Sequence, residues 1–226
     1  MKNKLLQRLN CLQVSTVFLI CFNSGLSAQT DTLKNPEQYL FREFSRGEVA
    51  MKTGNDLALI LNYNIVAEKM LFIQKGKLFE LLNPGSVDTI YLYDRRFIPA
   101  GKVFYEVLAE KNNLLFIQHR GDVQQPLKTD PYGTSSQASS TTPISNIKVG
   151  SIFYTFDDPN IKIKKETIYW VPRNNSMLSF KDGAQFIKIF PDYKNEIKLH
   201  IKQSNLKFVN PDEVLKLLVY CNSLMK

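Results

Sequence analysis

The sequence predicts a mainly β fold of the α+β class: an antiparallel sandwich or partly open barrel, followed by a smaller C-terminal unit of β-hairpin and helices. Three observations predict it. Short apolar runs rich in Ile, Tyr and Phe recur at roughly ten-residue spacing between Ala50 and Ile117. Turn sequences with Gly, Pro and Asn separate most of these runs. Apolar residues adopt a clear helical spacing only beyond Pro191.

The first 28 residues are typical of an export signal. Lys2, Lys4 and Arg8 precede an apolar run, and small residues lead to Ala28. The run is shorter than the roughly 20 apolar residues of a membrane-spanning helix. We therefore predict a signal peptide over residues 1–28, and we expect a periplasmic or envelope-associated protein. An uncleaved anchor is the alternative.

Residues 29–123 are predicted to form an N-terminal β-rich domain. Each strand candidate is a short apolar run next to residues that favour a turn. Phe41–Arg46 and Val66–Lys69 are candidates for short helical pieces. The strand candidates are Leu57–Leu61, Met70–Ile73, Leu78–Leu82, Thr89–Tyr93, Val103–Leu108 and Leu114–Ile117.

Residues 124–147 differ in composition from the rest of the chain. The stretch from Gly133 to Thr142 contains no large apolar residue, so burial cannot compensate the entropy of ordering it. We predict a flexible Ser/Thr-rich loop or linker here. A loop that becomes ordered on a partner is the alternative.

Residues 148–226 are predicted to form a C-terminal unit of β-hairpin and helices. Pro191 opens one helix, which extends to about Gln203, and Asn210 is the predicted cap of a second helix that begins at Pro211. The strand candidates are Ser151–Phe156, Ile161–Lys164 and Thr167–Val171, and the turns are Arg173–Asn175 and Asp182–Gly183.

Charge is concentrated in this last part of the chain, where 13 basic residues face 8 acidic ones. Lys194, Lys198 and Lys202 recur every fourth residue of the first predicted helix and are candidate contact residues. A basic surface on an exported protein favours acidic partners such as anionic lipid, glycan or an acidic protein face. Nucleic acid is not expected, because export removes the chain from it. A solvated lysine-rich surface is the alternative.

No catalytic residue, metal site or cofactor is predicted. Glu196 and His200 are four residues apart on a helix, but two ligands do not complete a metal site. Cys221 is the single cysteine after the signal, which excludes an internal disulfide, and its apolar helical surroundings predict a buried thiol. Asp157 and Asp158 fit a turn.

Aromatic and arginine side chains gather within one short stretch. Tyrosine and arginine are enriched at the energetic centres of protein interfaces, so these residues are the candidate contact residues. They equally suit the core and rim of a small β domain. The candidates are Tyr91, Tyr93, Arg95, Arg96, Phe97 and Tyr105.

Three features resemble exported proteins of Bacteroidota. The junction Ser27-Ala28-Gln29 is similar to their signal cleavage sites, and Asp31-Thr32-Leu33 and Asp88-Thr89-Ile90 are similar to their O-glycosylation sequence. The strand-rich Asn62–Leu108 stretch and the Phe190–Leu224 ending also look like secreted proteins of that group that have no assigned function. The resemblance implies an envelope setting and transfers no catalytic residue.

These observations favour a non-enzymatic periplasmic accessory or binding subunit of a cell-envelope complex. Its protein partner would be a component of an outer-membrane transport or secretion assembly. A glycan- or lipid-binding β-sandwich module is the first alternative. A hydrolase with a dispersed carboxylate pair, with Asp157, Asp158 and Glu196 as the residues to test, is the second.

Overall fold

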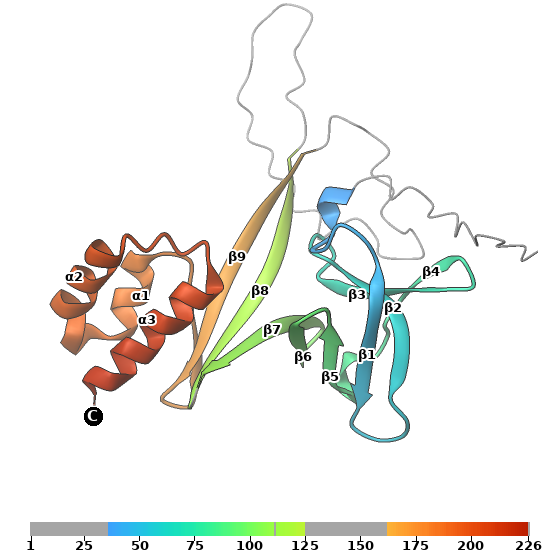
Figure 1. Ribbon diagram of the computed structural model, residues 1–226, viewed down its shortest axis with the longest axis horizontal. Coiled ribbons are helices and arrows are strands. Elements are labelled where there is room, and N and C mark those ends of the chain that lie inside the picture. The colour runs from blue at the N-terminus through green and yellow to red at the C-terminus, as the bar shows by residue number, and fades with distance from the viewer. Residues whose placement is uncertain (1–35, 111, 125–161, 226) are drawn as a thin grey trace, which may run out of the picture.

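The computed structural model describes residues 36–110, 112–124 and 162–225. Within these ranges the strands form one ten-stranded antiparallel sheet (Figure 1). The strands are β1 (Ser45–Met51), β2 (Leu57–Asn64), β3 (Lys69–Gln74), β4 (Lys77–Glu80), β5 (Val87–Leu92), β6 (Arg95–Ala100), β7 (Val103–Glu110), β8 (Asn113–Gln124), β9 (Lys162–Arg173) and β10 (Ser176–Phe180).

The helices follow the last strand and cover one end of the sheet. Asp182 caps the first of them, because its carboxylate accepts a hydrogen bond from the amide of Gln185. Asn210 caps the last one through the amide of Asp212. The helices are α1 (Gly183–Ile189), α2 (Lys194–Ser204) and α3 (Pro211–Leu224), and short 3-10 turns lie at η1 (Pro36–Gln38), η2 (Pro84–Ser86) and η4 (Pro191–Tyr193).

The strand order is β10-β9-β8-β7-β6-β5-β1-β2-β3-β4, so two meanders join where β1 pairs with β5. The sheet curls until β3 lies against β7. The curl brings the turn after β2 onto β8, where the Gly121 amide donates to the Ile65 carbonyl at 2.8 Å. A side chain on Gly121 would clash there, because a Cβ atom would lie 2.9 Å from Ile163 and 3.0 Å from both Ile65 and Val66.

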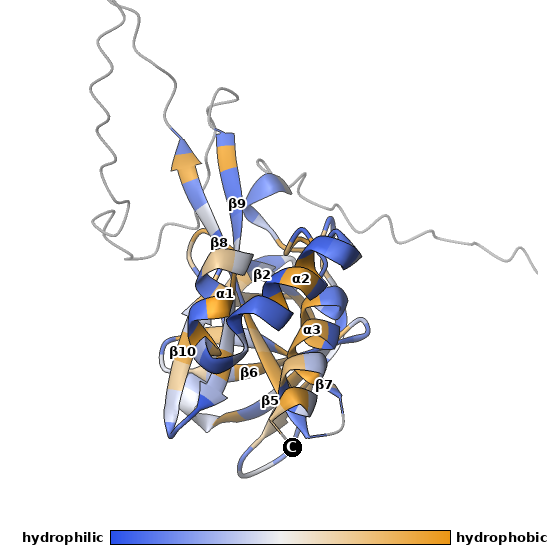
Figure 2. Cartoon of the chain, turned by 90° about the vertical axis from the view of Figure 1, so that its left-hand side faces the viewer, coloured by the Kyte–Doolittle hydropathy of each residue, from blue (hydrophilic) through white to orange (hydrophobic). Residues whose placement is uncertain are grey.

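Two hydrophobic clusters stabilise the fold. The strand cluster fills the curl and includes Tyr63, Phe97, Phe104 and Ile163. In the helical cluster, α1 and α3 pack on the sheet and α2 packs on α1, and apolar residues of all three helices are buried. Figure 2 shows hydrophobic and hydrophilic residues alternating along these helices. The buried members of the helical cluster are Leu115, Ile117, Tyr169, Val171, Phe180, Phe186, Ile189, Phe190, Ile197, Phe208, Val214, Leu215, Leu217, Leu218 and Cys221.

The predicted fold class is confirmed: the described chain is mainly antiparallel sheet with C-terminal helices, and the sheet remains open. The helix start at Pro211 is confirmed. Helical structure also begins at Pro191, although residues 191–193 form a 3-10 turn that precedes α2. The sequence of Ile161–Lys164 alternates apolar and basic residues, which predicts a strand with one wet face. In β9, Ile163 is buried between exposed Lys162 and Lys164, as this alternation predicts.

Several element predictions are wrong. Phe41–Arg46 and Val66–Lys69 form bends, a strand start and a turn in place of helices. The sequence Pro99-Ala100-Gly101 predicts a turn, but Pro99 and Ala100 belong to β6. The turn itself is made by Gly101, at a φ of 67°, and Lys102. Asp182-Gly183 begins a helix and is not only a turn, since the side chains of Phe186 and Ile189 are buried beneath it.

The predicted linker at 124–147 falls between two strands that pair with each other. β8 and β9 share nine registered residue pairs, from Phe116 with Trp170 to Gln124 with Lys162. The helical cluster takes residues from both strands. The predicted signal peptide, the Asp31-Thr32-Leu33 sequence, nearly all of the linker, the strand at Ser151–Phe156 and the Asp157-Asp158 turn lie outside the described residues.

Candidate functional site

Two exposed tyrosines mark one surface of the curled strands. Tyr91 in β5 exposes 47% of its surface, and Tyr93 in the following turn exposes 50%. Tyr93 adopts a positive φ of 56°, which lets the chain reverse between β5 and β6. Its ring lies 4.8 Å from the ring of Phe41, so one tyrosine is held by packing although it faces solvent.

A shallow hollow of about 470 Å³ lies beside these rings, over β1, β2 and β5. Gly47 allows the strands to approach here, because a Cβ atom at this position would lie 2.7 Å from the Tyr91 carbonyl oxygen. The lining combines aromatic, apolar and charged side chains of both signs. The lining residues are Arg46, Gly47, Glu48, Asp56, Leu57, Ala58, Tyr91 and Tyr93.

Further exposed side chains extend this surface, which we name the tyrosine face and define as the hollow with Ile60 and Arg96. Arg96 stands directly opposite Tyr91 in the β5–β6 ladder, and Ile60 stands opposite Arg46 in the β1–β2 ladder. Leu57 and Ile60 each expose 40% of their surface. Exposed aromatic and apolar groups ringed by arginine and carboxylates have the composition of a protein-contact surface.

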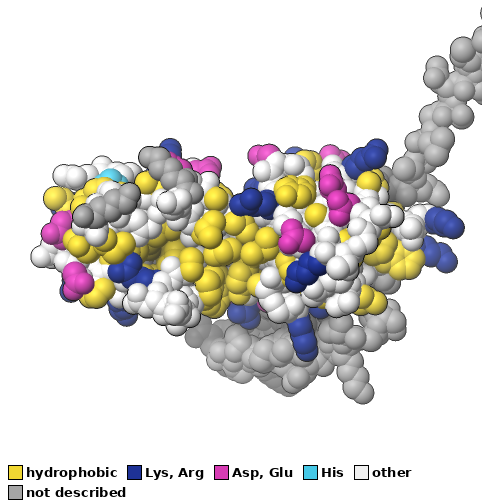
Figure 3. All heavy atoms as spheres, turned by 90° about the horizontal axis from the view of Figure 1, so that it is seen from below, with side chains coloured by type: hydrophobic (Ala, Val, Ile, Leu, Met, Phe, Trp, Pro, Cys, Tyr) yellow, Lys and Arg dark blue, Asp and Glu magenta, His cyan; other side chains and the backbone are white. Residues whose placement is uncertain are grey.

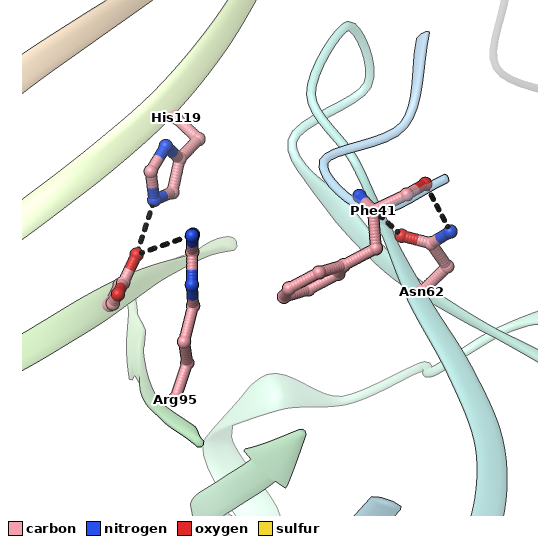
Figure 4. Close-up of polar contacts among 5 residues, drawn as sticks. Phe41, Asn62, Arg95 and His119 are labelled. Atoms are coloured by element: carbon pink, nitrogen blue, oxygen red, sulfur yellow. Dashed lines mark hydrogen bonds and ion pairs between the residues drawn. The ribbon is translucent and has the colours of Figure 1, made fainter. Parts of the chain in front are cut away.

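A buried polar cluster lies where β7 and β8 diverge (Figure 4). One carboxylate oxygen of Glu106 accepts hydrogen bonds from His119 Nε2 at 2.6 Å and from the Arg95 guanidinium at 3.3 Å. Glu106 and His119 are both buried, and Arg95 reaches in from β6 with its side chain 39% exposed. The three groups satisfy one another, so this cluster offers little to a ligand.

This cluster sits at the junction of the two hydrophobic clusters. Glu106 follows Phe104 of the strand cluster by two residues and precedes Leu108, which packs on the helical cluster, by two. His119 is likewise two residues beyond Ile117 of the helical cluster. Side chains two residues apart in a strand share a face, so the polar groups join both cores across one sheet surface.

Phe41 connects this cluster to the tyrosine face and is held in place by Asn62. The side-chain amide of Asn62 donates to the Phe41 carbonyl at 2.9 Å, and its carbonyl accepts from the Phe41 amide at 3.3 Å (Figure 4). The Phe41 ring, fixed in this way, touches Tyr93 and lies 5.3 Å from the Arg95 guanidinium carbon. Arg95 of the polar cluster and Asn62 therefore fix the position of the Phe41 ring, on which the Tyr93 ring packs.

The structure separates the other predicted contact residues. Arg95 turns toward Glu106, and Phe97 is fully buried in the strand cluster, which places it in the core instead of on a contact surface. The ring of Tyr105 stacks on Trp170 with 5.7 Å between the ring centres. Burial, and to a smaller extent the nearby charge of Glu68, raises the pKa of the Tyr105 hydroxyl.

Seen from below, hydrophobic side chains gather in the middle of this face, between the helices and the curled strands (Figure 3).

Lys194, Lys198 and Lys202 are exposed along α2, as the spacing predicts. Their helix packs on α1, at the end of the molecule far from β1 and β2. Leu199 on the same helix exposes 55% of its surface. The basic helix and the tyrosine face are thus two separate surfaces.

The candidate reactive groups do not gather into one cluster in the described residues. Cys221 is fully buried, which confirms the predicted buried thiol, and burial raises the pKa of this thiol to about 12. Glu196 is exposed on α2, and His200 stacks on Tyr220 at 4.0 Å. Thr89 is buried and donates its hydroxyl to Asp88, so the folded strand does not present it for glycosylation. Within the described ranges no three His, Cys, Asp or Glu side chains gather as metal ligands.

Sequence reasoning finds the two tyrosines and Arg96 of the tyrosine face and Arg95 of the polar cluster, but it misses the rest of both sites. Arg46, Glu48 and Asp56 lie 35 to 45 residues from Tyr91 in the chain and meet it only because β1 pairs with β5. Glu106 and His119 carry a weak signal, since each is the polar member of an otherwise apolar strand face.

Comparisons with protein-family models, with curated proteins and with solved structures found no match to this chain. Among the helices that the structure describes, none has the length and apolar character needed to cross a membrane.

Proposed function

We propose that this protein is a non-enzymatic periplasmic binding subunit of a cell-envelope complex, and that the tyrosine face receives its protein partner. The host complex is an outer-membrane transport or secretion assembly. The export-type leader supports the compartment, and the composition of the tyrosine face supports the contact.

One observation carries the proposal: two neighbouring tyrosine rings stand half exposed over a hollow with charges of both signs. Burying a tyrosine ring releases a large apolar area at a low cost in side-chain entropy, and its hydroxyl can still bind a polar partner. Packing on Phe41 fixes Tyr93 before binding, which lowers the ordering cost further. Arg96 beside Tyr91 adds a guanidinium suited to carboxylates of the partner.

The test is a pull-down from detergent-solubilised envelopes with the tagged full chain at native expression. The wild-type chain is expected to recover a specific envelope protein. The double variant Tyr91→Ala/Tyr93→Ala is expected to recover at least about 10-fold less, because truncating a hot-spot residue costs about 2 kcal/mol or more and tyrosine is enriched among hot spots. Quantitative mass spectrometry of the eluates gives the readout.

The matched control is Leu199→Ala, which removes an exposed apolar side chain from α2 and should leave recovery unchanged. Circular dichroism and thermal melting establish that all variants fold. The proposal is wrong if the wild-type chain brings down no other envelope protein after cross-linking, or if the double tyrosine variant recovers the same partner equally well.

A glycan ligand at the same surface is the second candidate. Two exposed aromatic rings beside a shallow hollow offer flat apolar faces to a sugar ring, and Glu48 and Asp56 offer acceptors for hydroxyl groups. This candidate predicts saturable thermal stabilisation of the wild-type chain by a purified glycan, lost in Tyr91→Ala. Stabilisation without any recovered protein would favour it over the protein partner.

A further inference from the structure

The strand β10 forms one edge of the sheet and pairs only with β9 (Figure 2). Residues 176–179 are all exposed, including Met177 at 43% and Leu178 at 36%. The strand sequence SMLSF contains no charge and no proline. Natural sheets usually protect an edge strand with charged residues or proline, because an open row of N–H and C=O groups recruits other strands.

Hairpin geometry identifies the open groups. Asn174 and Asn175 make a two-residue loop with φ values of 50° and 58°, and Ser176 pairs with Arg173 next to it. A loop of this kind makes the flanking residues a hydrogen-bonded pair, and the pattern then alternates along the ladder. The N–H and C=O groups of Met177 and Ser179 therefore point away from β9.

The molecule closes its own edge just beyond this point. The amide of Lys181, next in the outward row, donates to the side-chain oxygen of Gln185 in α1 at 3.0 Å. In the described structure, the outward groups of Met177 and Ser179 have no such partner from the chain.

The opposite edge is built differently. β4 is only four residues long and carries Lys77 and Glu80. Glu80 pairs with Lys69 of the neighbouring strand at 3.0 Å. A short, charged strand resists the addition of another strand. The edge at β4 is therefore protected, and the edge at β10 is not.

We propose that β10 pairs antiparallel with β10 of a second copy of this chain, about a two-fold axis at Leu178. This register opposes Met177 to Ser179 of the second copy, and the reverse, which satisfies the outward groups of both strands with four hydrogen bonds. The two sheets then continue as one. The dimer goes beyond the proposed function and uses a different surface from the tyrosine face.

The strand is complementary to itself in this register. The two Leu178 side chains meet at a non-hydrogen-bonded position, where side chains approach most closely. No like charges oppose one another, because Lys181 lies across from Asn175 of the second copy and is already paired with Glu166 at 2.6 Å. A two-fold contact of one patch with itself is the commonest way in which identical chains associate.

Charge variants at the axis give a test with a rescue. Light scattering with size exclusion should give a dimer for the wild-type chain at micromolar concentration. Leu178→Lys and Leu178→Glu each place like charges directly opposite one another, so each should be monomeric at that concentration. Mixing the two should restore a heterodimer, whereas Leu199→Lys, the matched exposed control, should remain a homodimer.

A cysteine at the axis tests the register. In a background with Cys11 and Cys21 replaced by serine, Leu178→Cys should oxidise to a disulfide-linked dimer, because opposed non-hydrogen-bonded residues suit disulfide geometry. Cys221 is buried and should not compete. A wild-type monomer throughout, or no disulfide at this position, overturns the proposal. A third outcome would assign the edge to a different protein. In that case the wild-type chain is monomeric, and an envelope protein that it recovers in pull-downs is lost with Leu178→Glu.

Discussion

At the scale of single residues, Glu106 is the most consequential side chain. Its carboxylate accepts from both His119 and Arg95 where the two hydrophobic clusters meet. We expect Glu106→Leu to lower the unfolding free energy by about 1–3 kcal/mol, because two donors lose their acceptor in a buried site. Urea denaturation followed by circular dichroism measures this change.

Two variants calibrate that result. Glu106→Gln keeps an acceptor oxygen and should lose less stability than Glu106→Leu. Glu110→Leu changes an exposed glutamate at the end of the same strand and should stay within about 0.5 kcal/mol of wild type. Equal losses for Glu106→Leu and Glu110→Leu would show that the buried cluster contributes nothing to stability.

Buried thiol and hydroxyl groups set the alkaline limit of the fold. Burial raises the pKa of Cys221 to about 12 from 9.0, and the pKa values of Tyr39 and Tyr169 to about 12 from 10.0. The unfolded chain therefore loses these protons first, so rising pH favours unfolding. We expect full stability below pH 9 and a decline toward pH 12, at about 1.4 kcal/mol per pH unit for each group.

Denaturant titrations at successive pH values measure this decline. Cys221→Ser should remove the decline in unfolding free energy that begins near pH 9. The decline caused by the tyrosines, which begins near pH 10, should remain. Stability that is constant between pH 9 and 12 would contradict burial of these groups.

At the scale of elements, the sequence predicts most of the apolar strands and misses β1, β6 and β10. Arg46 and Glu48 of β1 and Arg96 of β6 alternate with less exposed residues, but these runs are too polar to stand out. β10 is short and almost wholly exposed, so it has no buried face to give a pattern. α1 is missed because seven residues give too few turns for a helical period. Its Asp-Gly start is also a common turn sequence.

The cap of α1 gives a prediction at this scale. Asp182→Ala should lower the unfolding free energy by about 1 kcal/mol, since the Gln185 amide loses its acceptor. Asp182→Asn should retain most of that stability, because asparagine caps helices equally well. Thermal melts of the three proteins provide the measurement, and an alanine variant as stable as wild type would argue against the cap.

At the scale of the whole molecule, the ribbon of β8 and β9 belongs to both hydrophobic clusters. Leu115 and Tyr169 lie in the helical cluster, and Ile163 lies in the strand cluster. We therefore expect one cooperative unfolding transition, although the composition suggests separate units at 29–123 and 148–226. Fluorescence of Trp170, the single tryptophan, and far-ultraviolet circular dichroism should give coincident curves.

A helix-only and a strand-only perturbation test this cooperativity. Asp182→Ala in α1 and Gly121→Ala in β8 should each move both curves together, since the alanine methyl would press on Ile65 and Ile163. Two separated transitions in either variant would instead establish independent domains.

The tyrosine face is predictable from sequence only in part, for reasons that arise at this same scale. Tyr91 and Arg96 are close in the chain and are found by composition. Arg46 and Glu48 join them through the pairing of β1 with β5, which no local pattern encodes. The position of Phe97 in the core is also hidden, because alternation in β6 is masked by Arg95 and Arg96.

The contribution of Ile163 to the strand cluster has a consequence for biosynthesis. A nascent chain leaves the ribosome from its N-terminus, so the residues of β1 to β8 emerge before the side chain that completes their core. The first half cannot reach its final packing until β9 has been made. The export that we propose would then act on a chain whose hydrophobic core is still incomplete.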